Sequence, residues 1–223
     1  MTTQIYPIKV SKLGFKNYCY LIIHTKTREA VLIDPAWELD KIEEVIAFHQ
    51  VKLTAILLTH HHFDHINLAE PLARRYQIPV LMSKIESDYY HFSCYNLTYI
   101  EQLETIAFNH IKITPLLTPG HTKGALSYWI DKALFTGDTL FIEGCGICTG
   151  RGGDPEAMFE SLAYLKDTLL PETKIYPGHS FGQEPGKAFA YVAQNNIYLQ
   201  FTNCEDFVAF RMRKNQKGLL AFR

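Results

Sequence analysis

The stretch Thr59-His60-His61-His62-Phe63-Asp64-His65 follows the apolar run of residues 55–58 and decides the interpretation of the whole chain. Imidazole and carboxylate groups gathered this densely, without a thiolate, are typical of catalytic metal sites. Because alternate residues of an extended backbone face the same side, His60, His62 and Asp64 are predicted to converge. The residues between them are predicted to point away.

Composition and charge indicate a soluble globular protein. Of the 223 residues, 47% are hydrophobic and 20% are charged, which excludes a disordered or collagen-like chain. The net charge of −1 gives no global attraction to nucleic acid, so we expect no nucleic-acid partner. No run approaches 18 apolar residues, and no basic region precedes a long apolar one at the N-terminus. We therefore expect no membrane association and a cytoplasmic location.

The five cysteines favour reduced thiols over a disulfide framework, because their number is odd and they are widely scattered. Cys145 and Cys148 form a single C-x-x-C pair in a glycine-containing loop. With no second pair, this is weak evidence for a redox or zinc site. A tight loop carrying two small residues is the favoured interpretation, and the redox and zinc alternatives stay open.

Strand-length apolar runs recur along the chain, first as hairpins and later in alternation with helical patterns. This order indicates an α/β layered sandwich, and the lack of an interior linker predicts one domain over residues 1–223. A short helical extension is expected over about 185–223. The predicted strands cover residues 5–10, 18–23, 30–33, 54–58, 80–82, 111–117, 125–130, 133–135 and 174–176.

Apolar residues recur with a helical period over residues 39–49 and 157–170, which predicts two helices. The second helix has a start signal, because Asp154 can cap it and Pro155 suits its first turn. A further helix is expected to begin at His65 and to run over residues 66–76.

Residues 88–104 are rich in aromatic side chains that follow no clean period. The favoured interpretation is a loop or short-helix insertion that packs on the body of the protein. The alternative is a hydrophobic wall or lid over a substrate channel, since unpatterned aromatic loops often line ligand sites.

Four of the strand-like runs end immediately before a ligand-type residue. Because sites in layered α/β proteins form where strand ends converge, residues far apart in sequence are expected to meet. One catalytic zinc needs only three protein ligands, so seven candidate donors predict two metals that share a carboxylate. These donors are His60, His62, Asp64, His65, His121, Asp138 and His179.

Four motifs in this region resemble those of the metallo-β-lactamase superfamily, in particular its glyoxalase II-like branch. The resemblance implies an αββα four-layer sandwich. It also implies that His60, His62 and His121 hold the first metal, that Asp64, His65 and His179 hold the second, and that Asp138 bridges them. The motifs are HxHxDH at residues 60–65, Thr118-Pro119-Gly120-His121-Thr122, Gly137-Asp138-Thr139 and Pro177-Gly178-His179.

The whole chain is most similar to the zinc-dependent hydrolases found with trans-acyltransferase polyketide synthases. This likeness implies two Zn²⁺ ions, with iron or manganese as alternatives, and hydrolysis of an acyl thioester by a metal-bound hydroxide. Asp64 and Asp138 are the expected catalytic carboxylates, the first orienting the water and the second holding both ions. The expected partner is an acyl carrier protein that carries the acyl group.

The chain departs from glyoxalase II at three positions. Ile147 and Thr149 stand where that enzyme has a basic residue and a tyrosine, and Phe181 stands where it has a second tyrosine. Only 44 residues follow His179, too few for the longer helical domain that completes glutathione binding. We therefore expect these three residues to line a site for another thioester. A glyoxalase II-type hydroxyacylglutathione hydrolase and an iron-dependent persulfide dioxygenase are the alternatives.

Three further groups are assigned from their positions. His61 is expected to make a structural hydrogen bond, and Asp34 to support a metal ligand without binding metal itself. Residues 210–217 carry four positive charges, most simply as a solvated helix face. The alternative is that Arg213 and Lys217 dock an anionic partner, such as a phosphopantetheine arm or an acidic carrier protein.

Overall fold

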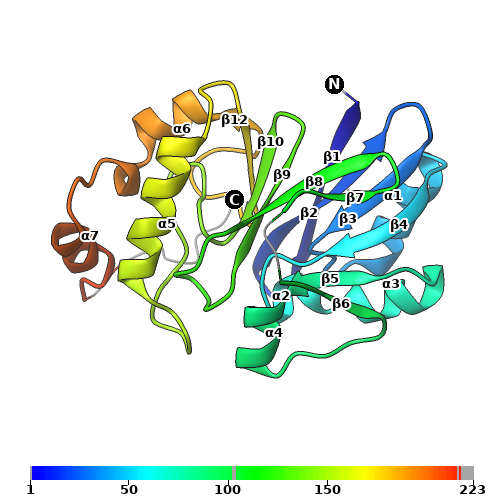
Figure 1. The fold of residues 1–223 in the computed structure, drawn as a ribbon, viewed down its shortest axis with the longest axis horizontal. Helices are drawn as coiled ribbons and strands as arrows, with labels where there is room; N and C mark the ends of the chain where they lie inside the picture. The colour runs from blue at the N-terminus through cyan, green and yellow to red at the C-terminus, as the bar shows by residue number, and fades with distance from the viewer. Residues whose placement is uncertain (1, 102–103, 215, 217–223) are drawn as a thin grey trace.

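Two six-stranded sheets pack face to face in the computed structural model, which describes residues 2–101, 104–214 and 216 (Figure 1). The strand orders are β1-β2-β3-β4-β5-β6 and β12-β11-β10-β9-β8-β7. The first sheet comprises β1 (Thr3–Lys12), β2 (Phe15–His24), β3 (Glu29–Ile33), β4 (Lys52–Leu57), β5 (Val80–Ser83) and β6 (Leu97–Ile100). The second comprises β7 (Ile106–Phe108), β8 (Ile111–Leu117), β9 (Leu126–Ile130), β10 (Ala133–Gly137), β11 (Lys174–Pro177) and β12 (Lys187–Ala188).

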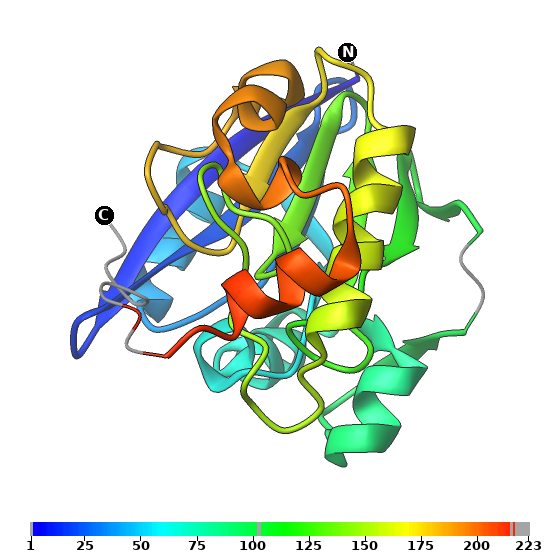
Figure 2. The same ribbon diagram turned by 90° about the vertical axis from the view of Figure 1, so that its left-hand side faces the viewer.

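Helices cover the outer face of each sheet, which confirms the expected αββα order of layers (Figures 1 and 2). The first sheet is covered by α1 (Leu39–Phe48) and α3 (Ala69–Tyr76). The second is covered by α5 (Pro155–Thr168), α6 (Phe189–Asn195), the 3-10 helix η1 (Ile197–Leu199) and α7 (Cys204–Arg211). Two short helices, α2 (Phe63–Ile66) and α4 (Lys84–Tyr90), follow β4 and β5 in the chain. None of the helices within the described ranges is long and apolar enough to cross a membrane.

Residues 18–23 of strand β2 are apolar without alternation, and the packing of the strand explains why. Leu21 and Ile23 pack in the core between the first sheet and its helices, whereas Tyr20 and Ile22 pack in the core between the two sheets. Successive side chains of a strand point to opposite faces, so a sheet covered on both sides needs apolar residues at every position.

All nine predicted strands are present, and the helices predicted over residues 39–49 and 157–170 correspond to α1 and α5. The Asp154 carboxylate caps α5 as expected, accepting hydrogen bonds from the backbone N–H groups of Glu156 and Ala157 at 3.0 Å each. The strands that the sequence did not reveal are β6, β7 and β12. They are short, with two to four residues, and lie at or next to a sheet edge where the apolar pattern is weak.

The single helix expected over residues 66–76 is wrong, because the chain forms α2 and α3 with a break between them. The carbonyl of Asp64 accepts a hydrogen bond from Asn17 Nδ2 at 3.0 Å, and the N–H of Leu68 donates to Pro35 O at 3.2 Å. The helical bond from residue 68 to residue 64 is therefore replaced by two tertiary bonds. Helix α2 also starts at Phe63, two residues before the predicted opening.

The aromatic segment 88–104 forms the end of α4 and the edge strand β6. Phe92 and Tyr95 pack against the core under the first sheet, which agrees with the favoured interpretation of an insertion that packs on the body. None of its described residues lines the cavity beside the candidate metal ligands, so the wall or lid alternative finds no support.

Candidate metal centre

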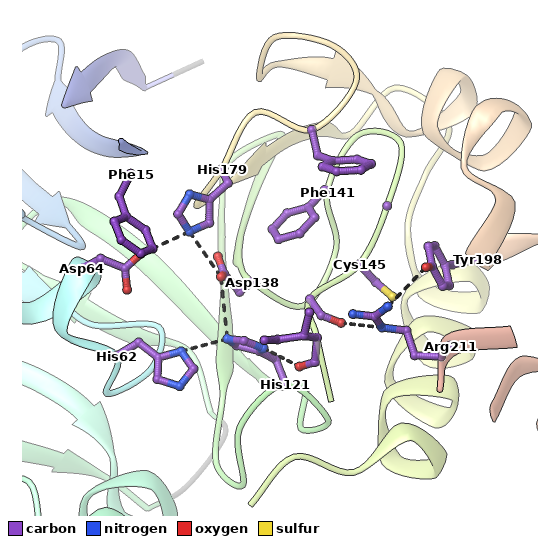
Figure 3. Close-up of a pocket in the computed structure, with 14 residues that line it drawn as sticks. Phe15, His62, Asp64, His121, Asp138, Phe141, Cys145, His179, Tyr198 and Arg211 are labelled. Carbon is purple, nitrogen blue, oxygen red and sulfur yellow. Dashed lines mark hydrogen bonds and ion pairs between the residues drawn. The ribbon is translucent and has the colours of Figure 1, made fainter. Parts of the chain in front are cut away.

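The seven candidate ligands converge where strands of both sheets end. His60 follows β4 of the first sheet, whereas His121, Asp138 and His179 follow β8, β10 and β11 of the second. His62, Asp64 and His65 are supplied by the turn into α2. Figure 3 shows His62, Asp64, His121, Asp138 and His179 turned toward one another around one end of a cavity.

The first group of donors is His60, His62 and His121. His62 Nδ1 lies 3.1 Å from His60 Nε2 and 2.9 Å from His121 Nε2. Ligands at 2.0–2.1 Å from a tetrahedral zinc are separated from each other by about 3.3 Å. The three nitrogens are therefore spaced to hold one ion of this kind.

The second group is Asp64, His65 and His179, whose donor atoms lie within 4.8 Å of one another. Asp64 Oδ2 lies 3.7 Å from His65 Nε2 and 3.4 Å from His179 Nε2. Two imidazoles and a carboxylate at these separations can hold a second ion.

Asp138 connects the two groups. Its Oδ2 lies 3.6 Å from His121 Nε2 in the first group and 3.3 Å from His179 Nε2 in the second. Its Oδ1 lies 3.5 Å from His65 Nε2. A carboxylate placed within reach of both groups could bridge two metals, the role that the family resemblance implies for Asp138.

Two atoms of the cluster are orphaned. Among the described residues, His65 Nε2 and Asp138 Oδ1 are buried and have no hydrogen-bond partner. Buried polar atoms in folded proteins are nearly always paired, because an unpaired one costs about 1–3 kcal/mol. A bound cation would satisfy both atoms at once, so the residues present fit a metal.

Three of the candidate histidine ligands have their outward Nδ1 atom engaged, which orients the inward Nε2 atom. His121 Nδ1 bonds to Ile147 O at 2.7 Å, and His179 Nδ1 bonds to Lys16 O at 2.7 Å. His60 Nδ1 lies 3.0 Å from the Thr59 hydroxyl. With Nδ1 held in this way, Nε2 is left as the atom that faces the cluster.

Asp34 orients the histidine next to it, as expected. Its Oδ2 lies 3.0 Å from His65 Nδ1, and the carboxylate also accepts bonds from the Thr59 N–H at 2.8 Å and the Thr59 hydroxyl at 2.6 Å. Asp34 therefore ties His65 to the end of β4 and supports the cluster from outside.

Two glycines let the backbone approach the cluster closely. A Cβ on Gly178 would stand 2.5 Å from His65 Cε1 and 2.6 Å from Asp138 Oδ1. A Cβ on Gly146 would meet the Asp138 carbonyl and stand 2.9 Å from the His121 ring. Any larger residue at these positions would displace a candidate ligand.

The surrounding protein groups shift the histidine pKa values of the two donor groups in opposite directions. Burial lowers the pKa of His62 to about 4, and neighbouring histidines add to that shift. Burial opposes the charged form of His65 and His179 too, but Asp64 and Asp138 outweigh it and raise their pKa values to about 9 and about 10. The pKa of Asp138 is well below its usual range despite burial, because His179 and His65 stabilise its charge.

His61 makes the structural hydrogen bond predicted for it. Its Nδ1 lies 2.8 Å from Oε1 of Glu86, its backbone N–H donates to the same oxygen at 3.0 Å, and its ring stacks on Tyr90. The extended pattern fails at Asp64, however, because α2 begins at Phe63. Asp64 reaches the cluster from a helical turn, where Asn17 Nδ2 holds its Oδ2 at 2.9 Å.

A cavity of about 280 Å³ opens beside the cluster, and its lining can be compared with the residues predicted to bind substrate. Ile147 and Phe181 line it as expected. Thr149 is exposed and is not part of the lining. Arg213 is also exposed, with its guanidinium carbon 3.8 Å from the Phe210 ring centroid, and Lys217 lies outside the described residues.

Several lining residues were missed by the sequence analysis. Arg211 is the most important, and its signal is the spacing from Phe207, since two residues four apart share a helix face and both are buried in α7. Cys145 also lines the cavity, and both loop thiols are buried, which raises the pKa of Cys148 to about 11. The other missed lining residues are Phe15, Phe141, Gly144, Gly146 and Tyr198.

Two stacked sheets with histidine and aspartate donors gathered at their strand ends define a candidate metalloenzyme of the αββα type. The chain belongs to the metallo-beta-lactamase superfamily, which it matches over residues 14–179.

Comparisons with known proteins refine this assignment. The chain is 44% identical over 223 residues to "Probable polyketide biosynthesis zinc-dependent hydrolase PksB" of Bacillus subtilis, covering 100% of this chain and 99% of that protein. It is 46% identical over 222 residues to "Probable polyketide biosynthesis zinc-dependent hydrolase BaeB" of Bacillus velezensis, with the same coverage. The crystal structure of ETHE1 from Myxococcus xanthus superposes with a TM-score of 0.83 at 29% identity, covering 97% of this chain and 95% of that one. The resemblance to zinc-dependent polyketide hydrolases is thus confirmed.

Proposed function

We propose that this chain hydrolyses acyl thioesters, with acyl groups on an acyl carrier protein of polyketide biosynthesis as its substrates. The observation that carries the proposal is Asp138, whose two oxygens lie 3.3–3.6 Å from donor atoms of both groups. The names of the two relatives support the polyketide setting. Two zinc ions, or iron or manganese in their place, would be held by the two groups with Asp138 between them.

When bound, the metals would supply an activated water and positive charge for the oxyanion that forms at the acyl carbon. The water adds to that carbon, the C–S bond breaks, and a carboxylic acid and a thiol are released. Asp64 lines the cavity and is held by Asn17, so its carboxylate can orient the water.

The rest of the cavity suits an acyl chain. Phe15, Phe141, Ile147 and Phe181 give it an apolar lining beside the cluster. Such a lining excludes water from the reacting group and binds apolar acyl carbons. A thioester at the end of a long pantetheine arm could enter the cavity from the solvent side.

The test measures metal content and thioester turnover on one preparation. After purification without added ions, we expect about two zinc ions per chain. We also expect metal-dependent release of acetate from acetylated carrier protein, measured by mass spectrometry. Asp138→Asn should lose both metal and turnover, whereas the control Asp88→Asn, at an exposed ion pair with Lys84, should keep both.

The outcomes separate the parts of the proposal. Turnover of small thioesters without release from the carrier protein would reject the carrier protein as substrate. No turnover of any thioester by the metal-loaded protein would reject the reaction. About one iron per chain would favour the dioxygenase alternative instead.

A further inference from the structure

Arg211 is a buried cation in the wall of the same cavity. Its side chain comes from α7 on the far side of the second sheet, and the residue is only 2% exposed. It lines the cavity together with His121 and Asp138. Figure 3 shows its guanidinium beside Cys145 and Tyr198, across the cavity from the candidate metal ligands.

The partners of Arg211 are all neutral. Nε donates to Gly146 O at 2.9 Å, and Nη1 donates to Gln216 Oε1 at 2.9 Å and to the Tyr198 hydroxyl at 3.4 Å. The Cys148 thiol is a further hydrogen-bonding partner, and no carboxylate of the described residues forms an ion pair with Arg211. A buried charge without a counterion is costly, so folded proteins normally pair it.

The position of Arg211 limits which anion could bind to it. Gly146 O bonds to its Nε, and a Cβ on Gly146 would stand 2.9 Å from the His121 ring, so ordinary bond lengths place Nε within about 10 Å of that ring. An anion bound there must be carried close to the reacting thioester. The phosphate of an extended pantetheine arm lies well beyond this distance from its own sulfur.

We propose that Arg211 binds a carboxylate carried by the thioester substrate and so makes the enzyme selective for acidic thioesters. A guanidinium is matched to a carboxylate in shape and charge, and the pair is strongest where water is excluded. The carboxylate can belong to the acyl chain or to the thiol. This inference rests on the proposed thioester hydrolysis and names the substrate class of that site.

The first experiment compares thioesters that differ only in the carboxylate. On the acyl side, the succinyl thioester of N-acetylcysteamine is compared with its neutral isostere, the 4-methylpentanoyl thioester. On the thiol side, acetyl glutathione is compared with its diethyl ester, in which both carboxylates are masked. We expect kcat/KM to favour the acidic member of one pair by about 10- to 100-fold, mainly through KM. The pair that shows the preference identifies the source of the carboxylate.

The variants assign the preference to Arg211. Arg211→Gln should reduce the ratio between acidic and neutral substrate to near one, and Arg211→Lys should give an intermediate ratio because it keeps the charge without the planar fork. Arg213→Gln, an exposed arginine two residues away, is the matched control and should keep the wild-type ratio. Metal content and thermal unfolding show that each variant is folded.

A binding measurement gives a readout that does not need turnover. Calorimetry with a thioether analogue of the preferred substrate should show about 10- to 100-fold weaker binding to Arg211→Gln than to the wild type or Arg213→Gln. If Arg211→Gln lost kcat/KM equally on acidic and neutral substrates, Arg211 would only hold the Gly146 loop in place. This result would overturn the inference.

Two further results are decisive. A wild-type enzyme that hydrolyses acidic and neutral thioesters equally would also overturn the inference while leaving the proposed function intact, and this result needs no variant. A preference seen only with acetyl phosphopantetheine would assign the charge to a phosphate and would likewise overturn it. Loss of turnover on every thioester would instead be a failure of the proposed function.

Discussion

Replacing Asp34 with asparagine tests whether the second donor group depends on the carboxylate that holds His65 Nδ1. Oδ2 of Asp34 faces the Thr59 hydroxyl at 2.6 Å and His65 Nδ1 at 3.0 Å, and both act as donors toward it. An amide placed there with its NH₂ on this side cannot accept either bond. Turned the other way, it would confront the Thr59 N–H, which donates to Oδ1 at 2.8 Å.

The expected effect follows from these contacts. Two buried donors left without an acceptor should lower the free energy of unfolding by about 2–6 kcal/mol. His65 can avoid the clash only by moving its proton to Nε2, the atom that faces the cluster, and this would block it as a metal ligand. We therefore expect the affinity for the second metal to fall about 10- to 100-fold, with the first group unchanged.

Graded chelator dialysis followed by elemental analysis measures the two affinities, and urea unfolding measures stability. Asp131→Asn is the matched control, because Asp131 also accepts several hydrogen bonds, from Thr2 and Thr3, but lies in the turn between β9 and β10. Equal retention of both metals by Asp34→Asn and wild type would refute the reasoning, as would equal weakening of both sites.

Other predictions concern protons, packing and metal removal. His65 and His179 have pKa values near 9 and near 10 in the protein alone, above the ordinary 6.5, so both are protonated at pH 7 and lose the proton only as pH rises through those values. Metal uptake at pH 7 should therefore release about two protons per chain, fewer at pH 10, measured by calorimetry in buffers of different ionisation enthalpy. Gly178→Ala should lose metal from the second group, as shown by elemental analysis, because the new Cβ would contact His65 and Asp138. Phe207→Ala should lower the free energy of unfolding by about 3–5 kcal/mol in a urea titration, since the Phe207 side chain of α7 is fully buried against α5. Chelation should abolish turnover, and added zinc should restore it.

Much of the fold could be predicted because the signals are local. A strand buried on both faces must be apolar at each position, and the runs at residues 18–23 and 30–33 show this directly. The Asp154-Pro155 start of α5 is equally local, since a cap acts within three residues. The break between α2 and α3 could not be predicted, because it depends on Asn17 and Pro35, which lie far away in sequence.

The sequence by itself determined the superfamily, the set of seven candidate ligands and their placement after strand ends, since each of these follows from short motifs and apolar runs. Only the tertiary structure decided which donors lie together, that Asp64 approaches from a helical turn, and that Arg211 lines the cavity while Arg213 does not. The reason is physical. Ligand type and strand propensity are properties of neighbouring residues. Burial, the separation of donors and the lack of a counterion for Arg211 among the described residues depend on how elements from both ends of the chain pack against each other.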